Sequence, residues 1–287
     1  MIRTGSDQYV AGTLVRTVIA LACAISVATT APAQTVSLRI APPVGDTVRM
    51  RLDQRVEMSG TTRLGAADST ATVVTTLLVI SRALVERREG VATVLLTWAD
   101  SVDASSSGAD SLVLADEMRR ALQSRRVRLR IAPDGATEIV GRDAEGAPEL
   151  RALFAQMPAT LPSTPIAVGY SWSRVMVAPI DPALATKGGG GKLHATFRLD
   201  SLSRNGESAY VSVVGTLSRP PSSKDGWATL TMSGSMNGGL VIDRRRGWIN
   251  DARVTYVVRS VLTPMSGSTA AAMRFRMKVT QWVRALP

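Results

Sequence analysis

Polar and apolar residues alternate strictly along several stretches of the chain. From Val48 to Met58, every second residue is charged and the residues between are apolar, apart from one glutamine. Side chains of a β-strand point alternately to its two faces, so this period predicts a strand with one buried face and one face in water. One-sided burial is typical of antiparallel sheets. The period returns at Val127–Ile131 and Met273–Val279, again with arginine or lysine at the wet positions.

Glycine-containing dipeptides separate these strand-like runs. They are Glu89-Gly90, Asp134-Gly135, Asn205-Gly206, Asp225-Gly226 and Arg246-Gly247. Residues that tolerate positive φ favour tight hairpins, so the chain is expected to form a meander. The C-terminal part predicts four successive strands, at Ala228–Met236, Leu240–Asp243, Trp248–Val261 and Met273–Val283. The runs Thr72–Ile80 and Val91–Trp98 alternate less and predict central strands buried on both faces.

Two segments have helical rather than strand periodicity. Ser111–Arg125 has apolar residues three and four apart and a possible capping serine. Pro148–Met157 begins with a proline, which the first helical turn tolerates. The predicted fold is therefore mainly β: one large curved antiparallel sheet or half-barrel of roughly eleven strands, counted from the period-2 runs, with two packed helices.

The N-terminus has the pattern of a secretory signal peptide. Arg3 and Arg16 precede the apolar run Thr17–Val27, which is followed by the small-residue motif Ala31-Pro32-Ala33. The run is too short to cross a bilayer core of about 30 Å as a helix. We expect residues 1–33 to be removed between Ala33 and Gln34. Residues 34–287 then form a single β-rich domain in the periplasm or outside the cell. A lipid anchor at Cys23 is the alternative, although Cys23 lies inside the apolar run.

The charge of the chain restricts the classes of partner that it is expected to bind. Its formal net charge is +11 and its hydrophobic content is 45%, enough for a large core. Export favours the anionic cell envelope as a partner over nucleic acid, and an aromatic content of 4% leaves few stacking platforms for bases. The arginine runs offer candidate anionic contacts, although exposed strand charges often serve only solvation. These candidates are Arg244, Arg245, Arg246, Arg126, Arg128 and Arg130.

No catalytic or metal-binding constellation emerges. His194 is the only histidine, and Asp200 lies six residues along the same predicted strand, Lys192–Leu202, roughly 20 Å away. One histidine without a cysteine after Cys23 is too few ligands for zinc or copper. The glycine run 188–191 lacks the flanking residues of a phosphate-binding loop. We therefore expect no enzyme activity, no metal and no cofactor.

Four segments resemble an uncharacterised family of secreted bacterial β-rich proteins, a domain of unknown function. They are Leu38–Met50, Ile131–Val140, Leu161–Ser173 and Gly239–Gly247, in the family's order. Tyr170 departs from the family, which often has aspartate there. The layout is also similar, at the level of fold only, to the LolA and LolB lipoprotein carriers. That similarity implies a curved sheet whose concave apolar face takes acyl chains.

Three functional hypotheses follow. The leading one is a non-enzymatic envelope protein that binds a lipid or lipoprotein acyl chain on the apolar face of the sheet. Its candidate contacts are Met50, Leu52, Phe154, Met273, Phe275 and Met277, which core packing would explain equally well. The second is an envelope scaffold whose arginine faces contact anionic polymer or headgroups. The third is a hydrolase with dispersed carboxylates, for which no spacing selects a pair.

Overall fold

A computed structural model describes residues 35–64, 67–107, 116, 119–120, 122–123, 126–141, 160–177, 191–222, 228–264 and 271–287. These residues form thirteen strands. In chain order they are β1 (Thr35–Val36), β2 (Thr47–Leu64), β3 (Ala67–Glu89), β4 (Ala92–Ser106), β5 (Arg126–Ile131), β6 (Thr137–Val140), β7 (Ile166–Ala167), β8 (Ser171–Val177), β9 (Lys192–Leu202), β10 (Ser208–Ser222), β11 (Ala228–Asp243), β12 (Trp248–Pro264) and β13 (Met273–Leu286).

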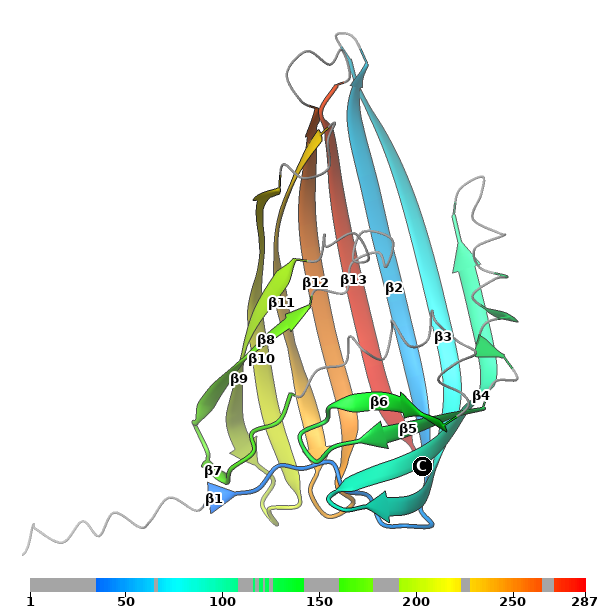
Figure 1. Ribbon diagram of the computed structural model, residues 1–287, viewed down its shortest axis with the longest axis vertical. Coiled ribbons are helices and arrows are strands. Elements are labelled where there is room, and N and C mark those ends of the chain that lie inside the picture. The colour runs from blue at the N-terminus through cyan, green and yellow to red at the C-terminus, as the bar shows by residue number, and fades with distance from the viewer. Residues whose placement is uncertain are drawn as a thin grey trace, which may run out of the picture. The chain divides into compact units, whose positions relative to one another are not determined.

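Eleven of the strands make one antiparallel sheet, which confirms the predicted meander. Its order is β6-β5-β4-β3-β2-β13-β12-β11-β10-β9-β8. The first long strand, β2, therefore lies beside the last, β13, in the middle of the sheet (Figure 1). From β2 the chain proceeds to one edge at β6, resumes at the other edge with β8, and returns strand by strand to β13. The short strands β1 and β7 form a separate two-stranded pair.

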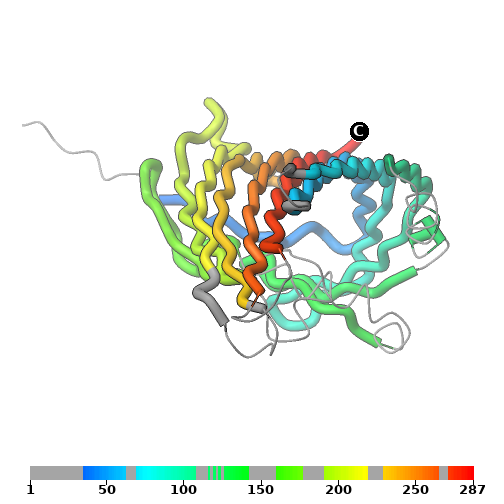
Figure 2. The backbone as a smooth tube through the Cα atoms, turned by 90° about the horizontal axis from the view of Figure 1, so that it is seen from above, coloured from blue at the N-terminus to red at the C-terminus, as the bar shows by residue number. Residues whose placement is uncertain are grey.

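The two faces of the sheet differ in chemistry. In Figure 2 the strands follow an arc, and we call the face that bears the core the inner face and the opposite one the outer face. On β9, Leu193, Ala195, Phe197 and Leu199 are buried on the inner face while the residues between them are exposed. The inner positions of this strand follow from its strict period of two.

The core lies at one end of the sheet, where a non-strand segment covers the inner face. Leu38 and Ile40 of the segment between β1 and β2 are buried against residues of the long strands. The Ile40 N–H donates to the carbonyl of Pro133, and the Ala41 N–H donates to that of Gly247, both at 2.8 Å. This segment passes across the lower strand ends in Figure 1. It thereby ties two hairpin turns together.

The loop before β8 completes this end of the core. Leu161 is fully buried, and the Trp172 indole N–H donates to the carbonyl of Thr160 at 2.7 Å. The Trp172 ring stacks on Phe197 with centroids 5.6 Å apart. An indole buried with its N–H satisfied contributes both apolar area and a fixed orientation, so the loop is anchored to β8 and β9.

Glycines on the inner face allow β11 and β12 to approach closely. A Cβ at Gly238 would overlap the carbonyl oxygen of Arg253, and one at Gly234 would overlap that of Val257. Glycine at defined strand positions is a recurrent means of bending a sheet. These glycines also explain a wrong prediction, because β11 is one strand over Ala228–Asp243 rather than two. Gly238 and Gly239 remain paired with both neighbouring strands.

The predicted turns are largely confirmed. Gly90, Gly135, Gly206 and Gly247 all have positive φ, between 60° and 94°. The turn at Asp225-Gly226 lies outside the described residues. So do nearly all residues of the two predicted helices. Within the first of these, the Gln123 N–H donates to the carbonyl of Arg119 at 2.8 Å, but no helical element is assigned in the described part of the chain.

No helix among the described residues is long and apolar enough to span a membrane.

Candidate functional site

An uncharged surface covers the inner face of the four central strands, β12, β13, β2 and β3. Among their described residues, no inner-facing position from 252 to 262, 273 to 285, 48 to 62 or 69 to 85 is charged. The acidic and basic residues of these stretches all face outward. This side of the central sheet is therefore uncharged, although it carries hydroxyl and amide side chains such as Ser260, Thr62 and Gln54 between the apolar ones.

The half of this surface farther from the core is exposed. Met58 of β2 lies opposite Met277 of β13 on one side and opposite Val73 of β3 on the other. Met58 is 46% exposed, Val73 39% and Met273 37%. We call Met58, Val73, Met273, Phe275 and Met277 the apolar patch. Methionine side chains are flexible and polarisable, and they line surfaces that adapt to their ligands.

The structure brings five of the six predicted apolar contacts onto one face. Met273, Phe275 and Met277 belong to the apolar patch. Met50 and Leu52 share the face but lie nearer the core, where the Trp248 indole N–H donates to the Met50 sulfur at 3.2 Å. Phe154 lies outside the described residues. The position of Met50 makes it a packing residue of the core end more than part of the exposed patch.

Sequence reasoning did not select Met58 or Val73, the two most exposed members of the patch. Met58 ends the clearest alternating run of the chain, so its side of the strand was readable. The exposure of Met58 could not be predicted from the sequence, because it depends on which strands lie on either side of β2. Gly60 lies two residues after Met58 on the same face of β2, directly opposite Phe275. An added Cβ at Gly60 would contact only the Phe275 ring, at 3.4 Å. The Phe275 ring therefore packs against Gly60 within the patch.

One titratable group borders the patch on the inner face. Tyr256 of β12 lies opposite Val279 of β13 and Met236 of β11. Burial raises the pKa of the Tyr256 phenol above its ordinary value. The hydroxyl is therefore neutral at physiological pH and leaves the inner face without charge.

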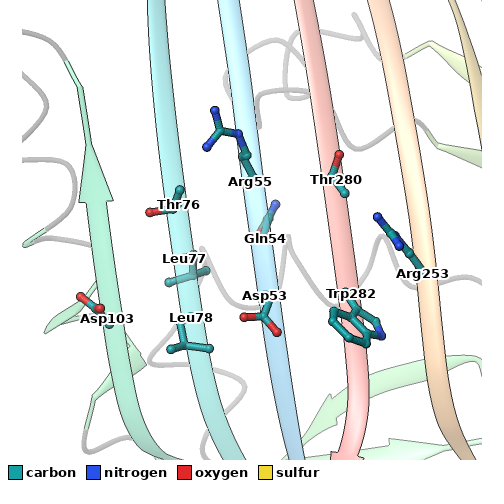
Figure 3. A pocket seen from close by; sticks show the side chains of 10 residues that line it. All are labelled: Asp53, Gln54, Arg55, Thr76, Leu77, Leu78, Asp103, Arg253, Thr280 and Trp282. Carbon is teal, nitrogen blue, oxygen red and sulfur yellow. The ribbon is translucent and has the colours of Figure 1, made fainter.

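The outer face of the same strands has a polar hollow of 320 Å³ (Figure 3). One row of side chains crosses it from strand to strand: Arg253, Trp282, Asp53, Leu78 and Asp103. The Trp282 indole N–H donates to Asp251 at 2.7 Å, and the guanidinium of Arg284 lies 4.4 Å from the ring centroid. Asp53 accepts a hydrogen bond from Arg51, also at 2.7 Å. Trp282 and Asp53 are therefore already engaged within the sheet.

The arginines of β5 mostly have local partners. Arg128 lies 3.0 Å from Glu86, and Arg130 lies 2.7 Å from Glu138. The hydrogen bond to Glu138 raises the pKa of Arg130 further above its ordinary value. Arg126 lies over the Trp98 ring, 5.8 Å from its centroid. These contacts stabilise the edge of the sheet and leave little charge free for a partner.

The arginines of the turn between β11 and β12 are similarly placed. Arg244 donates to the carbonyl of Gly206 in the neighbouring turn. Arg245 lies 4.0 Å from Glu207, and the backbone N–H of Arg246 donates to Asp243 at 2.8 Å. The structure therefore separates the six predicted anionic contacts into two groups, one on β5 and one in the turn between β11 and β12. His194 is exposed on the outer face of β9, opposite Val175 and Thr216.

Part of the chain matches a family whose function is unknown. Residues 143–249 match the family of unknown function DUF6263. Two of the four family-like segments, Leu161–Ser173 and Gly239–Gly247, fall inside this range. The match therefore supports the predicted resemblance to a domain of unknown function, and it says nothing of secretion. It supplies no activity.

No curated protein matches the chain. Among solved structures, an outer membrane channel from Pseudomonas putida F1 is 8% identical, with 86% of this chain and 97% of that chain covered and a TM-score of 0.20. A lipopolysaccharide binding protein is 10% identical, with 81% and 69% covered and a TM-score of 0.12. TM-scores this low do not establish a shared fold. Neither structure singles out the LolA and LolB carriers.

Proposed function

We propose that this domain is a non-enzymatic carrier or sensor of an amphipathic lipid, whose acyl chain lies on the apolar patch. The observation that supports the proposal is the uncharged inner face of four adjacent strands, with Met58, Val73 and Met273 exposed by 46%, 39% and 37%. Clustered exposed apolar side chains on a soluble protein mark sites of interaction.

An acyl chain suits this surface better than a polar ligand. Burying apolar surface contributes about 25 cal/mol per Å². A polar group placed on the patch would lose its hydrogen bonds to water and would find the hydroxyl groups of Ser260, Thr62 and Tyr256 as possible partners; left unpaired, a buried polar group costs roughly 1–3 kcal/mol. A flexible methylene chain has no such requirement, and methionines adapt to its shape.

The remaining parts of the proposal concern the setting of the site. The sheet acts as an open half-barrel whose concave side is the inner face. The chain works in the cell envelope after export.

Two measurements test the proposal. Native mass spectrometry of the protein from Gln34 onward, purified from envelope fractions, should show an added mass that organic solvent removes as a lipid. Delipidated protein should then bind a dansyl-labelled long-chain fatty acid saturably, with enhanced and blue-shifted emission. A clean protein mass together with no saturable emission change would contradict the proposal.

A further inference from the structure

A strip of cations runs along the outer face of the central sheet, on the side opposite the apolar patch. Arg274, Arg276 and Lys278 occupy successive outward positions of β13, about 7 Å apart along the strand. Arg259 of β12 lies directly opposite Arg276. We call Arg259, Arg274, Arg276 and Lys278 the cation strip. None of its arginines makes a hydrogen bond or ion pair in the part of the chain that the structure describes.

The cross-strand pair of arginines is unfavourable for the folded protein alone. Directly opposed residues of an antiparallel pair have Cβ atoms roughly 5 Å apart, and like charges there are destabilising. The outer face has two other opposed arginine pairs, Arg51–Arg284 and Arg49–Arg82, but each includes an arginine that is paired with an aspartate: Arg51 with Asp53 and Arg82 with Asp100, both at 2.7 Å. The uncompensated pair is therefore a departure from the pattern of the surrounding surface.

Among the described residues of the flanking strands β2 and β12, one acidic residue faces the strip. Glu57 of β2 lies opposite Lys278 and already accepts a hydrogen bond from Arg55 at 2.8 Å. That hydrogen bond, followed by the positive charges of Lys278 and Arg276, lowers the pKa of Glu57 below its ordinary value. A single carboxylate shared among these cations leaves a net positive surface.

Apolar side chains lie beside the cations on the same outer face. Val257 is opposite Lys278, Val261 is opposite Arg274, and Val74 is opposite Glu57. All three valines are half-buried. Cations interleaved with apolar side chains are typical of surfaces that rest in the headgroup region of a membrane. A small enclosed anion would instead require a pocket, and the strip is a row on an open sheet face.

We propose that the cation strip docks the domain on a bilayer of anionic phospholipid, with arginine guanidinium groups on lipid phosphates. Guanidinium groups match phosphate oxygens in a bidentate geometry. This inference does not rest on the proposed function, because the strip and the apolar patch lie on opposite faces of the same strands. The polar hollow opens on the same outer face, next to the strip along β13, and has the size at which small-ligand sites begin.

Vesicle co-sedimentation of the whole chain from Gln34 onward tests the proposal. The wild type should bind vesicles of mixed phosphatidylglycerol and phosphatidylcholine and not vesicles of phosphatidylcholine alone, with binding that weakens as salt rises. Arg276→Glu changes the charge of the strip by two, which should weaken binding by about 30-fold at roughly 1 kcal/mol for each charge. The same substitution should raise the melting temperature, because it replaces a like-charge pair with an opposite-charge pair.

Arg198→Glu is the matched control. Arg198 is an outward-facing arginine of β9, with a side chain 61% exposed, so the substitution makes the same charge change away from the strip. It should leave vesicle binding nearly unchanged. Arg259→Gln, which keeps the size and polarity of the side chain, should weaken binding by about fivefold.

Three results would overturn the proposal. The first is equal loss of binding in Arg276→Glu and Arg198→Glu, which would show dependence on net charge alone. The second is undiminished binding by Arg276→Glu. The third is binding to heparin, used as a soluble acidic polymer, without binding to anionic vesicles. Fatty-acid titration of Arg276→Glu should match the wild type, so failure of membrane docking and failure of the apolar patch are separately visible.

Discussion

Replacing Met58 with aspartate should abolish acyl-chain binding while leaving the domain folded. Burying a whole methionine side chain contributes about 1.5–3 kcal/mol. Met58 is 46% exposed, so a ligand that covers it gains roughly half of that, about 0.7–1.4 kcal/mol. In Met58→Asp this gain disappears and a carboxylate is taken out of water, at an effective cost of several kcal/mol. The affinity for a dansyl-labelled fatty acid should fall more than 100-fold.

Two further variants separate the patch from general effects of charge. Met58→Ser removes the apolar gain without adding charge, so it should weaken binding by only about 3- to 10-fold. Val214→Asp is the control, because Val214 is 60% exposed on the outward side of β10. Circular dichroism melts should show that both aspartate variants are folded, since each exposed strand substitution costs under about 1 kcal/mol. Binding by Met58→Asp within threefold of wild type, or equal loss in Val214→Asp, would refute the assignment of the patch.

Three other outcomes are expected. Leu161→Ala leaves a cavity at a fully buried loop position, so it should destabilise the domain by about 3–5 kcal/mol and lower its melting temperature by roughly 6–20 °C in calorimetry. Gly238→Ala should cost about 1–3 kcal/mol in urea unfolding, because its Cβ overlaps a β12 carbonyl, whereas Gly60→Ala should cost less than about 1 kcal/mol. The hydrogen bond from Arg55 lowers the pKa of Glu57 in the folded state, so Glu57 stabilises the fold above its unfolded-state pKa of about 4.3 and not well below it. Urea titrations should show a stability gap between wild type and Glu57→Gln at neutral pH that closes as the pH falls through the lowered pKa.

The strands themselves could be predicted from the local pattern of polar and apolar residues. The predicted strand Lys192–Leu202 has the bounds of β9, and the alternation at Val48–Met58 lies within β2. Period-2 alternation reports which side of a strand is buried, and a glycine that needs positive φ reports where the strand turns. Both are properties of a few neighbouring residues. They require no knowledge of the rest of the fold.

The pairing of strands that are distant in the chain could not be predicted from the sequence pattern. The pairing of β2 with β13 joins residues more than two hundred positions apart, such as Met58 and Met277. Alternation assigns each of these methionines to a face but not to a partner. The apolar patch exists only because this pairing places two apolar rows side by side. Candidate residues on single strands were therefore found, and the exposed centre of the site was not.

The cation strip was missed for a related reason. Arg274, Arg276 and Lys278 were read as a wet strand face, which they are. The informative fact is that Arg259 lies opposite Arg276. This register depends on the β12–β13 connection, and β12 itself contains an irregularity in its pairing with β11 near Ile249–Asp251. The arginine runs that were predicted instead, Arg126–Arg130 and Arg244–Arg246, are dense in charge along the sequence, but the side chains of Arg128, Arg130, Arg244 and Arg245 have local partners in the fold.

The central strands depart from the most stable arrangement on both faces at once. On the inner face, methionine and valine remain exposed. On the outer face, Arg259 and Arg276 oppose each other with no ion pair to any residue that the structure describes. Either feature could be removed by one substitution expected to stabilise the fold, and a clustered exposed apolar surface or an unpaired charge is a candidate interaction surface. The two departures are independent, because alternate residues of one strand reach opposite faces. Arg276→Glu and Met58→Asp should therefore have additive effects on stability and each remove one binding activity without the other. A variant of either kind that lost both activities would show that a single surface, not two, is responsible.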